Sequence, residues 1–274
     1  MDDSTIQSVA DRALPGPAIA DRSHWNAWGC AAVCIVGFLV FAVAQIIVFL
    51  VIFVHQFPDV FQGGVPIEAI EQLKTSAGLA RLLTAPNLFV MSLVSYGAFV
   101  AATAVAAWLG LGAGLKRLGI GIRPHLRQIV NGFLAGVGLL VLSTIVGSVQ
   151  AKVFGPHPQL IAEVLTRRHG AGAFVLDFAS VALLAPVGEE LFFRGVLFAG
   201  LSQRLPIAVA AILSGVTFGL AHGDLWNLPS LALIGIGLAY VYYRNGTLWS
   251  NITSHATVNG ITLVLTYVAP QLVK

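Results

Sequence analysis

Long apolar runs, more than any short motif, decide what this chain can fold into. A helix rises about 1.5 Å per residue, so about 20 apolar residues span the hydrocarbon core of a bilayer. Four runs approach or exceed this length and three shorter ones follow them, at residues 28–54, 88–109, 129–149, 174–201, 207–221, 228–243 and 248–268. The pattern predicts an all-α, polytopic transmembrane helical bundle of about seven spans (six to eight).

Composition and charge support this class and argue against others. Of the 274 residues, 57% are hydrophobic and 10% are charged, whereas a soluble domain usually carries about 25% charge. The net charge of +3 comes with basic residues scattered through loops, so we expect no nucleic-acid partner. The tightest basic cluster, Lys116, Arg117, Arg123 and Arg127, is typical of a cytoplasmic loop.

The domain organisation follows from the same runs. Residues 1–24 are polar, with Pro15 and Pro17, and predict a mobile tail. The first apolar run is too long for a signal peptide, so we expect an uncleaved anchor and a single transmembrane domain over residues 25–274. The part of this domain that carries the candidate functional residues is expected at about residues 171–268.

Smaller features complete the pattern between the spans. The segment from His55 to Pro86 has charges at helical spacing and predicts a short interfacial helix, whereas residues 151–170 are expected to be a loop. Gly132 and Gly136 form a GxxxG pair, which favours close helix packing without naming the partner. Cys30 and Cys34 lie one turn apart within the first span and are expected to serve as small apolar side chains.

Two adjacent glutamates, Glu189 and Glu190, lie inside one of these apolar runs. A charged carboxylate at the bilayer centre costs about 2.5–3.5 kcal/mol, so a membrane chain rarely keeps one without a use. Glu190 and Arg194 are four residues apart and can form an ion pair on one helical face. Glu189 is rotated by about 100° and lacks that partner. We interpret the pair as scaffold and Glu189 as a general base, although closing a helix end would be the simpler role for both acids.

Two further polar pairs follow, Phe218 with His222 and His255 with Asn259, each four residues apart. A single membrane histidine often does no more than pack against a neighbour, and an asparagine often joins two helices. The depths of these residues decide between the readings. Counted from the expected turns near Arg204 and Arg244, Glu189, His222, His255 and Asn259 share a slab roughly 11 Å thick. This convergence indicates a single buried site.

These three elements resemble the CPBP family of intramembrane proteases, also called the ABI or type II CAAX prenyl endopeptidase family. The family pattern has an EExxxR box, an FxxxH box and an HxxxN box in this order. Here the boxes are formed by Glu189, Glu190 and Arg194, by Phe218 and His222, and by His255 and Asn259. The resemblance covers about residues 171–268, and the amino-terminal half matches only in hydrophobicity.

The resemblance implies an endopeptidase that acts on membrane-associated or prenylated CAAX-type substrates. In the resemblance, the residues that activate water are Glu189 and His222. The oxyanion would be stabilised by His255 and Asn259. The glutamate helix would be held by Glu190 and Arg194, with Phe218 packed beside the site. Members are described as metalloproteases and as metal-free glutamate proteases. Glu189, His222 and His255 could supply a zinc set with an open position, although the sequence has no HExxH motif. We favour the metal-free reading.

Other functions are weighed against the same residues. A serine site of the GxSG type is absent from the spans, and Asp177 and Asp224 lack the context of paired aspartates. A transporter could use a buried polar cluster, but it would often show broken helices in both halves of the chain. A non-catalytic scaffold would keep the boxes for packing. We expect a multi-pass protein of a prokaryotic plasma (inner) membrane, with the lipid bilayer and a peptide or lipidated protein as partners; orientation, oligomeric state and natural substrate stay open.

Overall fold

The structure is a computed structural model that describes residues 27–58, 60, 67–108 and 124–270. Within these ranges the chain is helical and contains no strand, so the all-α fold class is confirmed. The expected mobile tail, residues 1–24, lies outside the described residues. So do Lys116, Arg117 and Arg123 of the basic cluster, while Arg127 lies in the first turn of a helix.

Each predicted span is helical in the structure, with ends that shift by a few residues. The helices are α2 (Ala27–Gln56), α6 (Ala85–Trp108), α7 (Leu126–Phe154), a continuous helical segment from Ala171 to Leu201, α12 (Ile207–Ala221), α13 (Leu228–Asn245) and α14 (Leu248–Val268). The continuous segment comprises α9 (Ala171–Asp177), η3 (Phe178–Leu184), α10 (Ala185–Phe192), η4 (Phe193–Phe198) and α11 (Ala199–Leu201). The two η elements are π-helical turns, which widen the helix by one residue.

Four of these helices are long and apolar enough to cross a membrane: α2, α6, α7 and the segment from Ala171 to Leu201. The protein is therefore an integral membrane protein. The remaining helices are shorter or more polar, and α12 has only 15 residues, which correspond to about 22 Å. The count of about seven spans thus depends on whether these three carboxy-terminal helices cross the bilayer fully.

Two loops differ from the prediction. The segment before α6 forms two short helices, α4 (Ile67–Leu73) and α5 (Ser76–Leu82), because the Thr75 side chain caps a new helix by accepting a hydrogen bond from Gly78. The expected loop at residues 151–170 instead contains the end of α7 and a helix, α8 (Leu160–Thr166). Val164 and Leu165 of α8 are buried, so tertiary packing stabilises a helix too short to recognise from its periodicity.

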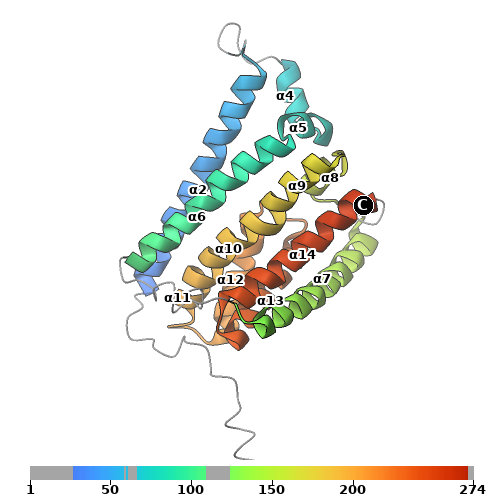
Figure 1. Ribbon diagram of the computed structural model, residues 1–274. Coiled ribbons are helices and arrows are strands. Elements are labelled where there is room, and N and C mark those ends of the chain that lie inside the picture. The colour runs from blue at the N-terminus through green and yellow to red at the C-terminus, as the bar shows by residue number, and fades with distance from the viewer. Residues whose placement is uncertain (1–26, 59, 61–66, 109–123, 271–274) are drawn as a thin grey trace, which may run out of the picture.

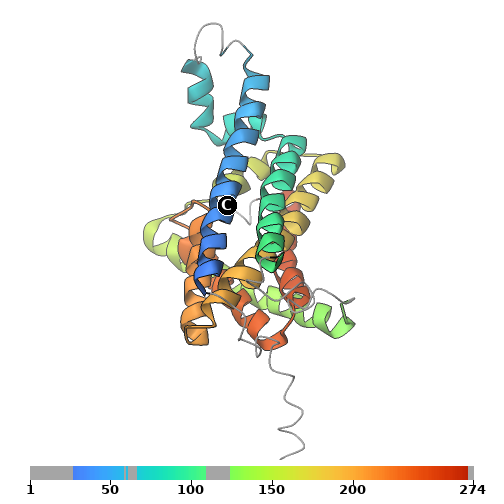
Figure 2. The same ribbon diagram turned by 90° about the vertical axis from the view of Figure 1, so that its left-hand side faces the viewer.

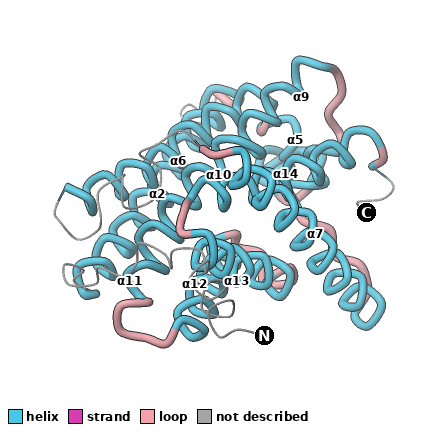
Figure 3. Tube along the Cα trace, turned by 60° about the horizontal axis from the view of Figure 1, so that its bottom comes forward, coloured by secondary structure: helices cyan, strands magenta, loops and turns pink. Residues whose placement is uncertain are grey.

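The helices form two groups that meet along α10. Figures 1 and 2 show α2 and α6 as a pair on one side of the molecule, and Figure 3 shows α12 and α13 packed together on another. Aromatic rings join the pair to the rest of the bundle, since Phe99 of α6 stacks on Phe41 of α2 and on Phe192 of α10, with ring centroids 4.3 Å apart in both cases. The glutamate-bearing helix is therefore held by a closely packed aromatic core.

The glycine pair of α7 has a defined partner. A Cβ atom at Gly132 would lie 2.5 Å from the backbone oxygen of Ser250, and one at Gly136 would clash in the same way with Ser254. Both contacts lie on α14, so the small-residue motif lets α7 approach the backbone of α14 closely. This packing holds α14, which carries His255 and Asn259, directly against α7.

Candidate active site

Glu189 and Glu190 lie in α10, one turn after Pro186, and both are buried, with 6% and 0% of their surface exposed. The predicted ion pair is present: Nη1 of Arg194 donates to Oε1 of Glu190 at 2.8 Å, and both side chains are inaccessible to solvent. Nη2 of Arg194 donates to the backbone oxygen of Gly235 in α13 at 2.8 Å. The pair therefore joins α10 to α13 and is not a mere surface contact.

Glu190 also contacts α14, which sequence reasoning did not foresee. Its Oε1 lies 2.8 Å from Nδ1 of His255, and its Oε2 accepts a hydrogen bond of 3.0 Å from the amide of Asn251. Asn251 was not among the candidate residues. A signal was available, because Asn251, His255 and Asn259 follow one another at intervals of four and so form one polar stripe on an otherwise apolar helix.

Glu189 differs from its neighbour in what surrounds it. Its Oε2 is buried without a hydrogen-bond partner, and Nε2 of His255 lies 3.8 Å from this atom. Tyr96 of α6 borders Glu189 on another side and interacts with its side chain both electrostatically and through a hydrogen bond. The backbone of α6 can approach α10 this closely because Gly188 has no Cβ atom. A Cβ atom at this position would lie only 2.8 Å from the Cβ of Tyr96. Glu189 is thus a buried carboxylate with one oxygen, Oε2, that accepts no hydrogen bond.

His222 follows the last residue of α12 and is oriented by the helix it terminates. Its Nδ1 lies 2.8 Å from the backbone oxygen of Phe218. A carbonyl oxygen can only accept, so this contact places a proton on Nδ1. In the neutral form of the ring, Nε2 is then the acceptor. The Phe218 ring, itself buried, contacts the rings of His222 and His255 and lies 4.8 Å from the guanidinium carbon of Arg194. Phe218 therefore packs against both histidines and the buried arginine.

The position of Asn259 follows from an irregularity in the helix opposite. In η3 the backbone pairs over five residues, as when Ala185 donates to Ser180. The next donor along the chain would be Pro186, which has no N–H, so the carbonyl of Val181 has no helical partner. The amide of Asn259 donates to this oxygen at 2.9 Å. One of its two N–H groups is thereby used, and the other remains available to a ligand.

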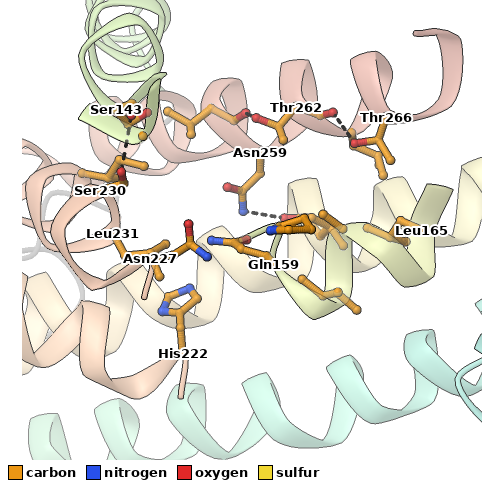
Figure 4. A pocket seen from close by; sticks show the side chains of 18 of the residues that line it. Ser143, Gln159, Leu165, His222, Asn227, Ser230, Leu231, Asn259, Thr262 and Thr266 are labelled. Carbon is orange, nitrogen blue, oxygen red and sulfur yellow. Dashed lines mark hydrogen bonds between the residues drawn. The ribbon is translucent and has the colours of Figure 1, made fainter. Parts of the chain in front are cut away.

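Glu189, His222 and Asn259 all line one cavity of about 470 Å³, which is within the usual range for ligand pockets. Figure 4 shows His222 and Asn259 on different walls of this space. The remaining lining comes mainly from apolar, hydroxyl and amide side chains of α6, α7, α13 and α14. His255 is 3% exposed and lies behind Glu189, outside the lining. The structure therefore brings the four predicted residues to one place, three at the cavity wall and one behind it.

A loop contact borders the same cavity. The ring of His157, in the turn between α7 and α8, lies over Trp226 with centroids 3.8 Å apart, and Asn227 donates to the backbone oxygen of His157. Asp224 accepts hydrogen bonds from the backbone of Trp226 and Asn227, so this acid orders a turn and does not pair with a second aspartate. These contacts order the loop that follows His222 and connects α12 to α13.

The metal reading can be tested on the donor atoms. Within the described residues, no three side chains of the His, Cys, Asp or Glu type are grouped so that they could hold a metal ion. In particular, Nδ1 of His222 is hydrogen-bonded to the backbone oxygen of Phe218, and Nδ1 of His255 is hydrogen-bonded to Glu190. Of the histidine nitrogens, Nε2 of His255 is the one that approaches Glu189. Glu189, His222 and His255, which could have supplied a zinc set, do not form a three-donor group in this arrangement.

The fold and the site together define an integral membrane protein with a buried carboxylate, two histidines and an amide around one cavity. Residues 171–261 match the family model described as type II CAAX prenyl endopeptidase Rce1-like. Over 138 residues the chain is 28% identical to the Bacillus subtilis (strain 168) protein named "Putative membrane peptidase YdiL". That match covers 48% of this chain and 54% of the relative, so the chain spans about half the length of the relative it matches. No solved structure matches the chain.

The matched region contains all three boxes, from Glu189 to Asn259. The carboxy-terminal half of the chain is thus similar to the type II CAAX prenyl endopeptidases and to a membrane peptidase relative, in the region where the sequence pattern indicates the resemblance.

Proposed function

We propose that the protein is an intramembrane endopeptidase that hydrolyses peptide bonds of membrane-associated proteins by a metal-free, glutamate-based mechanism. One observation carries the proposal. Glu189 is a buried carboxylate with an oxygen that has no partner, at the wall of a cavity that also contains a histidine and an amide. A buried acid of this kind is poised to take a proton from a bound water molecule.

The remaining groups fit successive parts of peptide hydrolysis. With its proton on Nδ1, His222 presents Nε2 as a second acceptor that can orient the water for Glu189. The hydroxide formed attacks the substrate carbonyl carbon, and the negative charge moves to the carbonyl oxygen. The free N–H of Asn259 and, when its ring carries both protons, the Nε2–H of His255 can donate to that oxygen. Glu189 then returns its proton to the leaving amine.

The substrate class is proposed on the family description, which names CAAX prenyl endopeptidases. A chain surrounded by lipid meets proteins that are themselves anchored in the membrane. We therefore propose membrane-associated or prenylated CAAX-type proteins and peptides as substrates, in a prokaryotic plasma membrane.

The test compares detergent-purified wild-type protein with Glu189→Gln on quenched fluorescent peptides that include a farnesylated CAAX peptide. We expect cleavage by the wild type and a loss of about 10²- to 10⁴-fold in the variant, because a general base contributes about that factor. The melting temperature should change little. Glu71→Gln, on the exposed helix α4, serves as the matched control and should cleave normally.

A zinc chelator added to the same assays separates the two mechanisms. Cleavage that persists with the chelator and disappears in Glu189→Gln would support the proposal. Cleavage abolished by the chelator and restored by zinc would overturn its metal-free part. A folded wild type that cleaves none of the peptides would favour a transporter or a non-catalytic scaffold instead.

A further inference from the structure

Asn251 is a buried polar residue that the proposed mechanism does not use. It lies in α14 one turn before His255 and is fully inaccessible to solvent. Its Nδ2 donates to Oε2 of Glu190 at 3.0 Å and to the backbone oxygen of Leu238 in α13 at 2.7 Å. Both of its N–H groups are thereby engaged, so the orientation of the amide is fixed by two helices.

The bonds of Glu190 divide unequally between its two oxygens. Oε1 is shared by Arg194 and His255, whereas Asn251 donates to Oε2. The terminal torsion of a glutamate side chain is soft, so a carboxylate held at one oxygen alone can rotate. The bond from Asn251 removes this freedom and leaves Oε1 aimed at Nδ1 of His255.

The ring of His255 is oriented through the same bond. An ionised carboxylate can only accept, so the contact with Glu190 places a proton on Nδ1 of His255. Nε2 then points in the other direction, toward Oε2 of Glu189, 3.8 Å away. The orientation of a functional histidine is commonly set by the group bound to its other nitrogen.

We propose that Asn251 is a positioning residue for His255. By fixing the carboxylate plane of Glu190, it holds the imidazole with Nδ1–H toward Glu190 and Nε2 toward Glu189 and the cavity. Asn251 does not line the cavity, so it acts through Glu190 and His255 and not on the substrate. This inference rests on the proposed function, because it assigns a purpose to the orientation of His255 in that site.

The experiment uses the full chain in detergent with two variants of different severity. Asn251→Leu removes both donors at similar size, and Asn251→Ser keeps one hydroxyl donor in case the leucine variant does not fold. Ser254→Ala is the matched control, because Ser254 is buried next to His255 in the same helix and its hydroxyl has no partner. Cleavage is measured as kcat and KM, alongside the melting temperature.

We expect kcat to fall about tenfold or more in Asn251→Leu, as is typical when an outer partner of a functional histidine is lost. KM should stay within about twofold of the wild type, and Asn251→Ser should recover part of the loss in kcat. A purely structural asparagine would instead lower the melting temperature and leave kcat of the folded protein unchanged, which would overturn the proposal.

A second readout needs no substrate. Nitrogen-15 NMR of histidine-labelled protein distinguishes an Nδ1-protonated ring from an Nε2-protonated one, and a His255→Gln sample identifies the signal among the seven histidines. Wild type and Ser254→Ala should show the proton of His255 on Nδ1, whereas the Asn251 variants should show a mixture. An unchanged signal in folded Asn251→Leu, or in folded Asn251→Ser with a reduced kcat, would overturn the inference even if Glu189→Gln upholds the protease. Failure of cleavage in the wild type would overturn the proposed function and leave this test intact.

Discussion

Two buried acid–arginine pairs occur in the part of the chain that the structure describes, and a comparison of their surroundings separates a structural role from a chemical one. Glu190 and Arg194 form the pair at the candidate active site, in the middle of the bundle. Asp177 and Arg168 form the other, near the end of the molecule where α8, α9 and the end of α14 meet (Figure 1). Both acids are fully buried, so burial alone does not distinguish them.

At the outer pair every acceptor is accounted for. One oxygen of Asp177 accepts from Arg168 and the other accepts from the hydroxyl of Tyr267 at 2.6 Å. The second amine of Arg168 donates to the backbone oxygen of Leu83. This network connects the α5–α6 turn, the α8–α9 turn and the end of α14, and it leaves no acceptor at the acid for a ligand.

The inner pair has a second acid beside it that is not satisfied. Glu190 is held by Arg194, His255 and Asn251, but Oε2 of the adjacent Glu189 has no donor. A buried acid in a membrane protein is treated as functional by default. The comparison refines that rule, because a fully bonded acid indicates a structural joint and an acid with a free oxygen at a cavity indicates chemistry.

The comparison is tested most strongly by removing one partner of the inner pair. Glu190→Ala leaves Arg194 buried without its counter-ion, which should cost about 3–5 kcal/mol in the free energy of unfolding. Unfolding in detergent, followed by circular dichroism against added denaturing surfactant, measures the loss. Glu189→Gln is the control in the same helix and should lose little stability. A loss below about 1 kcal/mol for Glu190→Ala would contradict the assigned role.

The outer pair should show a smaller loss of stability and no direct loss of chemistry. Asp177→Asn removes the charge that Arg168 faces, although Arg168 keeps its bond to Leu83. We expect about 1.5–3 kcal/mol, the usual contribution of hydrogen bonds to a charged group. Cleavage by the folded fraction should match the wild type. A variant of normal stability that does not cleave would instead make Asp177 part of the site.

This comparison also shows what the sequence could predict. The apolar runs locate the helices because a membrane requires long hydrophobic segments, and spacing by four places Glu190 with Arg194 and Phe218 with His222 within a single helix. Such pairs depend only on local geometry. The short helix α8 was missed because its stability comes from packing of Val164 and Leu165 against distant segments.

Contacts between helices were harder to foresee. Depth arithmetic brings the four candidate residues, His222 included, into one slab, but rotation of each helix about its axis decides which side chains meet. The bond from Asn251 to Glu190 depends on that rotation. The bond from Asn259 to Val181 depends in addition on a π-helical turn, whose unpaired carbonyl the periodicity of the sequence does not reveal. Arg168 and Tyr267 were likewise not linked to Asp177 beforehand.

The smallest expected loss of stability comes from removing the single hydrogen bond that Tyr267 donates to the acid of the outer pair. Tyr267→Phe removes one hydroxyl and leaves one oxygen of Asp177 without a donor, while the contact with Arg168 remains. We expect a loss of about 1.5 kcal/mol in the free energy of unfolding, at the lower end of the range for a hydrogen bond to a charged group, and unchanged kcat. A double-mutant cycle with Asp177→Asn measures the coupling, because the tyrosine change should cost much less once the charged acceptor is gone. Additive losses would mean that the hydroxyl of Tyr267 does not act through Asp177, and no loss at all would mean that Tyr267 acts only by ring packing against Phe174. In either case the outer acid would have a free oxygen of its own, and hydrogen-bond satisfaction would no longer separate the two regions.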